Sequence, residues 1–177
     1  REFLQFDADY VGTKNLQADA ELCVLISEIL EKCGLDTKDY TVKISSRKFT
    51  DKLFEKLKIK SKEQISTILR ALDKIDRLGW GEAKKLLGEG RKDKSGDYTK
   101  GANLNINQIK IIENALKSKT SDSEDVLEVI KIFKDYNFEN YKFDPSVIRG
   151  LEYYTGPIFE VNLNFEVKNL KGQAIQF

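Results

Sequence analysis

The 177-residue sequence contains no histidine, and this absence excludes several kinds of catalytic site. Without an imidazole, the chain itself cannot form a Ser-His-Asp triad or a catalytic Cys-His pair. It also cannot form a zinc site that uses a histidine ligand. Any chemistry that the chain carries must therefore use carboxylates, arginine, tyrosine, lysine or the backbone.

Methionine is also missing, even at the first position, and the sequence opens directly in a patterned stretch, REFLQFDADYVG. We therefore expect the chain to be a piece of a longer protein. Its hydrophobic content of 40% still suffices for a sizeable core, so the length suits one domain or one domain with an insertion.

The sequence lacks both a long apolar run and an excess of one charge. No apolar run approaches the roughly 18 residues that a bilayer-spanning helix needs, and no charged-then-apolar leader precedes the first motif. We therefore expect a soluble, cytosolic protein without membrane association. Lysine and arginine total 30 against 29 acidic residues, so net charge does not indicate a nucleic-acid binder, although a local basic patch remains open.

Cysteine occurs only at Cys23 and Cys33, ten residues apart on one predicted helix. Ten helical residues span about 15 Å, which is too far for a disulfide bond. We interpret both as reduced thiols in the core, because free cysteine is frequently buried.

The chain opens with a predicted strand. Residues 2–9 alternate between apolar and polar side chains, which predicts a strand with one apolar face. Gln5 and Asp9 share the other face, about 13 Å apart at strand rise, so they could line opposite ends of a small cavity.

Apolar residues recur at helical spacing through much of the chain, and Gly34 is placed to end the first helix in a left-handed conformation. Between the first two helices, Val42 and Ile44 would share one face of a short strand over 40–45. The pattern predicts helices over 17–33, 49–57, 61–75, 80–87, 105–118 and 123–136.

The order of these elements indicates an α+β fold with an insertion. The stretch GEGRKDKSGDYTKG (88–101) is rich in glycine and charge and lacks an apolar period, so we expect an exposed mobile loop. Residues 60–142 form a predicted helical insertion between a first part of the main domain (1–59) and its return (143–177). In the return, the alternation of IFEVNLNFEV and the turn residues NLKG predict a hairpin in a sheet.

The stretch RGLEYYTG, residues 149–156, carries an arginine, two adjacent tyrosines and two glycines just before this hairpin. From the residues alone it allows two interpretations. In one, the tyrosines are ordinary strand residues and the arginine pairs with a nearby carboxylate. In the other, Arg149 and Tyr154 serve one pocket; because their parity differs, the strand must then twist or bulge, and Gly150 is the natural place.

RGLEYYTGPIFEV closely resembles the histidine-binding signature Arg-Gly-Leu-Asp-Tyr-Tyr of histidyl-tRNA synthetases. The opening REFLQFDADYVG resembles the second half of motif 2 of these class II enzymes, and QADAEL (17–22) resembles the segment that follows it. The two motifs appear in the family's order, separated by a helical insertion as in the family. The resemblance covers essentially the whole chain, although only loosely in the insertion.

The resemblance implies a catalytic-domain fragment with the class II antiparallel sheet and flanking helices. The implied enzyme joins L-histidine to ATP as histidyl-adenylate, with Mg²⁺ carried by the ATP, and transfers histidine to tRNA(His). It also implies a homodimeric, cytoplasmic protein, with a mitochondrial form left open. No protein nucleophile is needed because the substrate carboxylate attacks, so positioning and electrostatics carry the catalysis.

The resemblance also implies roles for individual residues. Gln5 and Asp9 would contact the substrate's amino group and neighbouring pocket, and Tyr154 would hydrogen-bond its imidazole, with Tyr153 in the same histidine-binding set. Arg149 would bridge the substrate carboxylate and the α-phosphate of ATP. Its planar guanidinium suits two neighbouring anionic groups and stabilises charge that builds at the α-phosphorus.

This sequence departs from the family pattern in several places. Glu152 stands where the signature usually has Asp, which keeps the charge and lengthens the side chain by a methylene. Motif 1, the leading arginine of motif 2, the glycine-rich motif 3 and the anticodon-binding domain are missing. Arg1 matches only the later arginine of motif 2, and the resemblance implies for it an ATP or acceptor-end contact. We expect the 177-residue chain alone to be inactive.

Other functions remain open. One alternative is a catalytically silent synthetase-like module for tRNA sensing or regulation; another is a helical protein-interaction domain. The presence of Gln5, Asp9, Arg149 and Tyr154 favours the enzyme. The lysines of the insertion either contact the tRNA backbone or coat solvated helix faces.

Overall fold

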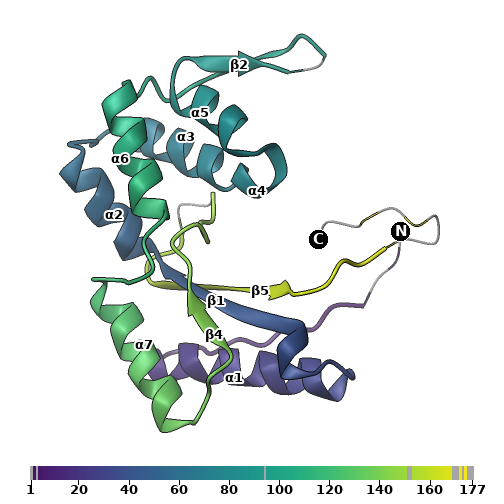
Figure 1. Ribbon diagram of the computed structural model, residues 1–177. Coiled ribbons are helices and arrows are strands. Elements are labelled where there is room, and N and C mark those ends of the chain that lie inside the picture. The colour runs from purple at the N-terminus through teal and green to yellow at the C-terminus, as the bar shows by residue number, and fades with distance from the viewer. Residues whose placement is uncertain are drawn as a thin grey trace. The chain divides into compact units, whose positions relative to one another are not determined.

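The protein is described here by a computed structural model that covers residues 2, 4–93, 95–150, 153–168, 172 and 174. The chain is built from helices and short strands (Figure 1). The elements in chain order are α1 (Leu16–Lys32), the 3₁₀ helix η1 (Thr37–Asp39), β1 (Tyr40–Ser46), α2 (Arg47–Lys56), α3 (Lys62–Leu72), α4 (Ile75–Leu78), α5 (Trp80–Leu87), β2 (Gly90–Lys92), β3 (Tyr98–Lys100), α6 (Ile106–Leu116), α7 (Glu124–Asp135), β4 (Tyr141–Phe143) and β5 (Pro157–Leu163).

The chain forms two compact units that do not follow chain order. The first contains the residues up to Val42, Glu128–Tyr141 and the residues from Val161 on; the second contains Lys43–Leu127 and Lys142–Glu160. The predicted domain boundaries at 60 and 142 stay a prediction.

A three-stranded sheet with the order β4-β1-β5 contributes residues to both units. The Asn164 amide donates to the Asp39 carbonyl (2.8 Å) before β1, and the Arg47 amide donates to the Gly156 carbonyl (2.9 Å) after it. Because the partner numbers fall as those near β1 rise, β5 runs antiparallel to β1. The sheet with flanking helices confirms the predicted α+β class.

In the first unit, α1 begins and ends as its sequence predicts. The Asn15 side chain accepts from the Gln17 amide at the N-terminus of the helix. At the other end, Gly34 adopts φ +95° and its amide donates to the Glu31 carbonyl (2.9 Å). Cys23 is buried as predicted, and burial raises the pKa of its thiol; Cys33 is exposed, so its predicted burial is wrong.

The second unit contains a continuous apolar cluster built largely by α2, α3, α5 and α6. Ile68 and Leu69 of α3, Leu87 of α5 and Ile112 of α6 are fully buried within it. The Ser61 side chain accepts from the Gln64 amide and caps α3. The helices predicted at 80–87 and 105–118 are thus confirmed as amphipathic helices that share one core.

Two predicted elements differ in the structure. The expected loop 88–101 is a hairpin in which β2 pairs with β3 in antiparallel register, Arg91 opposite Thr99. The expected strand 2–9 is absent among the residues that the structure describes. Its apolar side chains Leu4 (98%) and Phe6 (82%) lie exposed, as does Val11 (93%) just after it. A strand needs a partner for its amides and carbonyls, which residue alternation alone does not supply.

The predicted C-terminal hairpin is confirmed in part. β5 forms as expected, and Lys168 makes an isolated antiparallel bridge with Ala174. The predicted turn, 169–172, lies outside the described residues except for Gly172, which has φ +75°. Among the described residues, none of the helices combines the length and apolar character of a membrane span.

Candidate active site

The described residues of the conspicuous sequence RGLEYYTG lie in a loop that leads into β5. We call residues 149–156 the tyrosine loop; residues 151 and 152, including the unusual glutamate, lie outside the described residues. Because β5 begins only at Pro157, the side chains of the loop are not bound to alternate faces of a strand. The expected bulge at Gly150 is therefore unnecessary, and Gly150 does not have a positive φ.

Arg149 points its guanidinium toward β5. Its Nη2 atom lies 3.9 Å from Oε2 of Glu160, and the two side chains are 45% and 32% exposed. Such a pair is long and partly solvated, so it orients the guanidinium while leaving other N–H donors free. An arginine held in this way can bind a carboxylate or a phosphate oxygen from solution.

The rings of Tyr153 and Tyr154 pack against each other in a tilted arrangement, on the same loop as this arginine. Their ring centroids are 4.8 Å apart with an interplanar angle of 31°. The hydroxyl of Tyr154 raises the pKa of Tyr153, desolvation adds to the rise, and the positive charge of Arg149 opposes it. Tyr153 therefore stays protonated at neutral pH and offers an O–H donor.

The N-terminal end of the tyrosine loop rests on α3. A Cβ built on Gly150 would lie 3.4 Å from Cγ of Arg70 and 3.5 Å from Oδ2 of Asp73. These are ordinary to close contacts, and a side chain larger than a methyl group would need to displace one of these neighbours. Glycine at this position thus allows the loop to approach the helix directly.

Gln5 and Asp9 lie in the extended segment before α1, in the other unit. Gln5 Nε2 donates to Oδ1 of Asp7 (2.9 Å), and both Gln5 and Asp9 are exposed. The next residue, Tyr10, donates its hydroxyl to Glu21 of α1 (2.5 Å), and this hydrogen bond lowers the pKa of Glu21. The end of the segment is therefore attached to α1, while its polar side chains remain accessible.

The structure groups Arg149, Tyr153 and Tyr154 on one loop and Gln5 and Asp9 on one segment of the other unit. That the two groups form one pocket stays a prediction. Arg1, the predicted contact for ATP or the acceptor end, lies outside the described residues.

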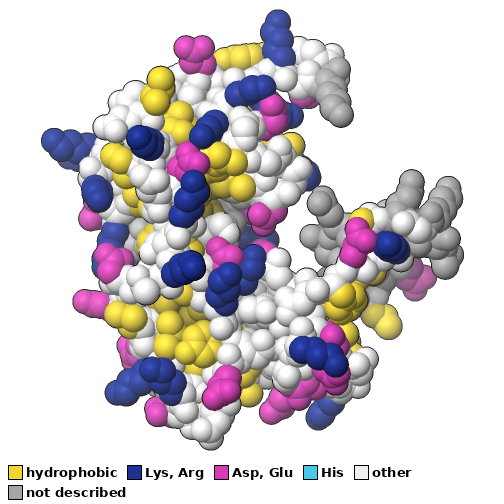
Figure 2. Space-filling view, viewed as in Figure 1, with side chains coloured by type: hydrophobic (Ala, Val, Ile, Leu, Met, Phe, Trp, Pro, Cys, Tyr) yellow, Lys and Arg dark blue, Asp and Glu magenta, His cyan; other side chains and the backbone are white. Residues whose placement is uncertain are grey.

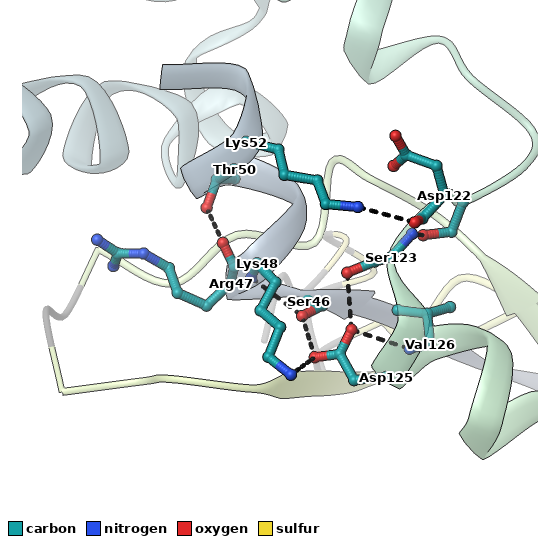
Figure 3. A network of polar contacts seen from close by, with 10 residues as sticks. Ser46, Arg47, Lys48, Thr50, Lys52, Asp122, Ser123, Asp125 and Val126 are labelled. Carbon is teal, nitrogen blue, oxygen red and sulfur yellow. Dashed lines mark hydrogen bonds and ion pairs between the residues drawn. The ribbon is translucent and has the colours of Figure 1, made fainter. Parts of the chain in front are cut away.

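Sequence reasoning missed a polar network next to the tyrosine loop. Asp125 of α7 is 2% exposed and accepts from the hydroxyls of Ser46 (2.6 Å) and Ser123 (2.7 Å) (Figure 3). Lys48 Nζ lies 3.8 Å from the same carboxylate. Serine before a helical pattern is an N-cap signal that could have identified Ser46, but no local signal relates it to a residue 79 positions away.

Within the described part of the chain, no group of three or more His, Cys, Asp or Glu side chains is placed to hold a metal ion. The donors of the tyrosine loop are instead a guanidinium and two phenols. Such groups bind anions and neutral polar groups by hydrogen bonds.

Comparison with known proteins gives consistent results. The model of the histidyl-tRNA synthetase family matches residues 1–166. The chain is 41% identical to histidine–tRNA ligase of Bartonella henselae and 42% identical to that of Rhizobium meliloti, and both alignments cover 100% of this chain. They cover 41% and 40% of the relatives, so the chain spans about two fifths of the length of the curated relatives it matches.

Solved structures agree on the fold. Histidyl-tRNA synthetase from Nostoc sp. PCC 7120 superposes with a TM-score of 0.68 at 22% identity, over 85% of this chain and 37% of that one. A Bacillus halodurans protein described as an ATP phosphoribosyltransferase regulatory subunit/histidyl-tRNA synthetase gives 0.58 at 20% identity, over 86% and 40%. At these identities the likeness concerns the fold alone.

Proposed function

This chain belongs to the histidyl-tRNA synthetase family, and from that premise we propose that it forms part of the catalytic domain of a histidine–tRNA ligase. The complete enzyme would activate L-histidine with ATP to histidyl-adenylate and transfer the histidyl group to tRNA(His). The chain would supply histidine recognition and one of the charges that stabilise adenylate formation.

The observation that carries this proposal is the placement of Arg149 beside the Tyr153–Tyr154 pair on one loop. In the adenylation step, a histidine carboxylate oxygen attacks the α-phosphorus of ATP, the new O–P bond forms, and diphosphate leaves. Negative charge grows on the α-phosphate oxygens during attack. Arg149 can donate to the carboxylate and to an α-phosphate oxygen at once, which aligns the reactants and stabilises that charge.

The tyrosines supply the other half of recognition. An imidazole has one N–H donor and one acceptor when neutral, and it needs polar partners at defined positions. The Tyr154 hydroxyl, with Tyr153 packed against its ring, would hydrogen-bond the imidazole. Gln5 and Asp9 would receive the α-ammonium group, for which a carboxylate and an amide oxygen are suitable acceptors.

Further features belong to the same proposal. Mg²⁺ would enter with ATP as part of the substrate, and Arg1 would contact ATP or the acceptor end of the tRNA. The complete enzyme would act as a homodimer in the cytoplasm. On the face shown in Figure 2, basic and acidic side chains are interspersed, so any tRNA contact there would use scattered lysines and arginines.

The test is amino-acid-dependent ATP–pyrophosphate exchange with the full-length gene product that contains these 177 residues, assayed with each of the twenty amino acids. We expect exchange with histidine alone, and a loss of at least about 100-fold in Arg149→Ala, because a group aimed at the developing charge is removed. Arg77→Ala, at an exposed position of α4, is the matched control and should keep the parental rate.

Two outcomes would contradict the proposal. A folded full-length protein without exchange for any amino acid would favour a catalytically silent tRNA-sensing or regulatory module. Undiminished exchange in Arg149→Ala would leave the activity in place and remove the role proposed for this arginine.

A further inference from the structure

The C-terminal end of the tyrosine loop is held by the first residue of α2. The Arg47 amide donates to the Gly156 carbonyl at 2.9 Å, two residues after Tyr154. Among the described residues of the loop, this is the one main-chain hydrogen bond before β5 begins. Pro157 follows and has no N–H of its own, so it cannot donate a further main-chain hydrogen bond to fix this end.

The donor is unusually well suited to this task. Arg47 is the first residue of α2, and the first amides of a helix have no partner within the helix. They also carry the positive end of the helix dipole, which favours a carbonyl oxygen as acceptor. The Ser46 side chain accepts from the Lys48 amide (3.1 Å), so the Arg47 amide remains available for the loop.

The peptide unit that carries this N–H is itself immobilised. Ser46, which precedes it, is 1% exposed and donates its hydroxyl to Asp125 at 2.6 Å. Asp125 is held in turn by Ser123 and by the Val126 amide (3.0 Å), as Figure 3 shows. On the other side, the hydroxyl of Thr50 donates to the Arg47 carbonyl at 2.7 Å.

We propose that Arg47 acts, through its main-chain N–H, as a positioning residue for the tyrosine loop, and that Ser46 and Asp125 fix the direction of that N–H. The Tyr153–Tyr154 pair is thereby presented in one orientation. The consequence for catalysis rests on the function proposed above: the N–H would affect histidine binding more than chemistry. Tyr154 lies two residues before Gly156, whose carbonyl accepts from the Arg47 amide. Arg149 lies at the other end of the loop, next to Gly150, which rests on α3.

The N–H can be removed with little other change to the helix. Proline is favoured at the first position of a helix, so Arg47→Pro deletes the donor without interrupting α2. Ser46 already has φ −149° and ψ 145°, the extended conformation that a residue before proline requires. Arg47→Ala is the matched control: it removes the same side chain, including the Nε–Asp51 pair (2.9 Å), and keeps the N–H.

In the full-length protein, we expect Arg47→Pro to raise the KM for histidine about tenfold over Arg47→Ala, the effect of losing one well-formed hydrogen bond. The KM for ATP should differ less than about twofold between the two variants, and kcat less than about threefold. A purely structural defect would not separate the two substrates in this way.

A second readout does not depend on activity. Chymotrypsin cleavage after Tyr153 and Tyr154, followed by mass spectrometry without substrates, should be several-fold faster in Arg47→Pro than in Arg47→Ala. Should Arg47→Pro fail to fold, Ser46→Ala replaces it, because this variant frees the peptide unit from Asp125 and keeps the N–H. Ser46→Thr retains the hydroxyl and should therefore be cleaved by chymotrypsin as slowly as the parental protein.

The outcomes are distinguishable. Equal cleavage and equal KM for histidine in the two Arg47 variants would overturn the inference. No histidine-dependent exchange in the parental protein, together with faster cleavage in Arg47→Pro, would overturn the proposed function and leave the positioning role established.

Discussion

Asp144 illustrates how single charged residues are used in this protein. It follows β4, accepts from the Ser146 hydroxyl (2.5 Å) and pairs with Lys43 of β1, whose Nζ lies 3.0 Å from Oδ2. Burial alone would raise the pKa of this carboxyl, but Ser146 and Lys43 together outweigh burial and lower it. The folded state therefore favours the charged carboxylate.

The direction of this shift predicts how stability depends on pH. Because the folded pKa lies below the unfolded value of about 3.9, Asp144 contributes stability above that value, and the contribution is lost as pH falls through the folded pKa. In urea denaturation, Asp144→Asn should be about 1 kcal/mol less stable than the parent at pH 7. The difference should shrink as pH falls from about 5 to 3. A difference independent of pH would contradict the role given to the charge.

At the scale of secondary structure, the β2–β3 hairpin depends on two glycines that bring its strands together at the base. A Cβ on Gly101 would lie 2.2 Å from the Gly88 carbonyl oxygen, and one on Gly90 would lie 2.3 Å from that of Thr99. Both obstacles are backbone atoms, which cannot rotate away. Gly90 also has φ +125°, which side chains with a Cβ rarely adopt.

Gly101→Ala should therefore lower the free energy of unfolding by about 2 kcal/mol or more, because the methyl group would overlap the backbone of residues 88–90 and force the base of the hairpin apart. Gly81→Ala on α5 is the matched control, since a Cβ there meets nothing within 4 Å and the residue is helical. It should leave stability unchanged or raise it slightly. Equal thermal or urea midpoints for the two variants would show that the base of the hairpin can relax.

At the scale of the whole molecule, the exposed apolar side chains of the first segment matter most. Leu4, Phe6 and Val11 are almost fully solvated. They lie on both sides of Tyr10, whose hydroxyl attaches the segment to Glu21 of α1. Residues of this kind are normally buried in a packed sheet. The chain spans about two fifths of the length of the curated relatives it matches.

We expect the isolated 177-residue chain to form no histidyl-adenylate above background when it is incubated with ATP and histidine. Catalysis by positioning requires that both substrates be held and water excluded, and the polar side chains of Gln5 and Asp9 are open to solvent here. Radiometric detection of adenylate measures this directly. Steady synthesis by the purified chain would show that these residues form a complete site without further structure.

Much of the fold follows from local sequence. The helices are specified by apolar periodicity and by caps such as Asn15, Ser61 and Gly34, whose effects extend only a few residues. β1 was also predicted from local sequence, by the alternation of Val42 and Ile44, and both side chains are buried. The residues RGLEYYTG likewise identified the candidate site and its family without any structure.

Other features required the tertiary structure, because they depend on contacts between residues far apart in the chain. Apolar alternation in 2–9 resembles a strand, yet only a neighbouring strand can complete one. The glycines of 88–101 were expected to permit a mobile loop; in the folded chain they allow two backbones to meet.

The sequence by itself determined which residues are the candidates for the chemistry: Arg149 and the tyrosine pair lie within one short motif whose residue types suit anion and imidazole recognition. Only the tertiary structure decided what holds that motif in place. The Asp125 carboxylate reaches Ser46 across 79 positions, and the Arg47 amide reaches Gly156 across more than a hundred. Such hydrogen bonds leave no local pattern, because any buried serine, aspartate or amide can make them once folding brings a partner within reach.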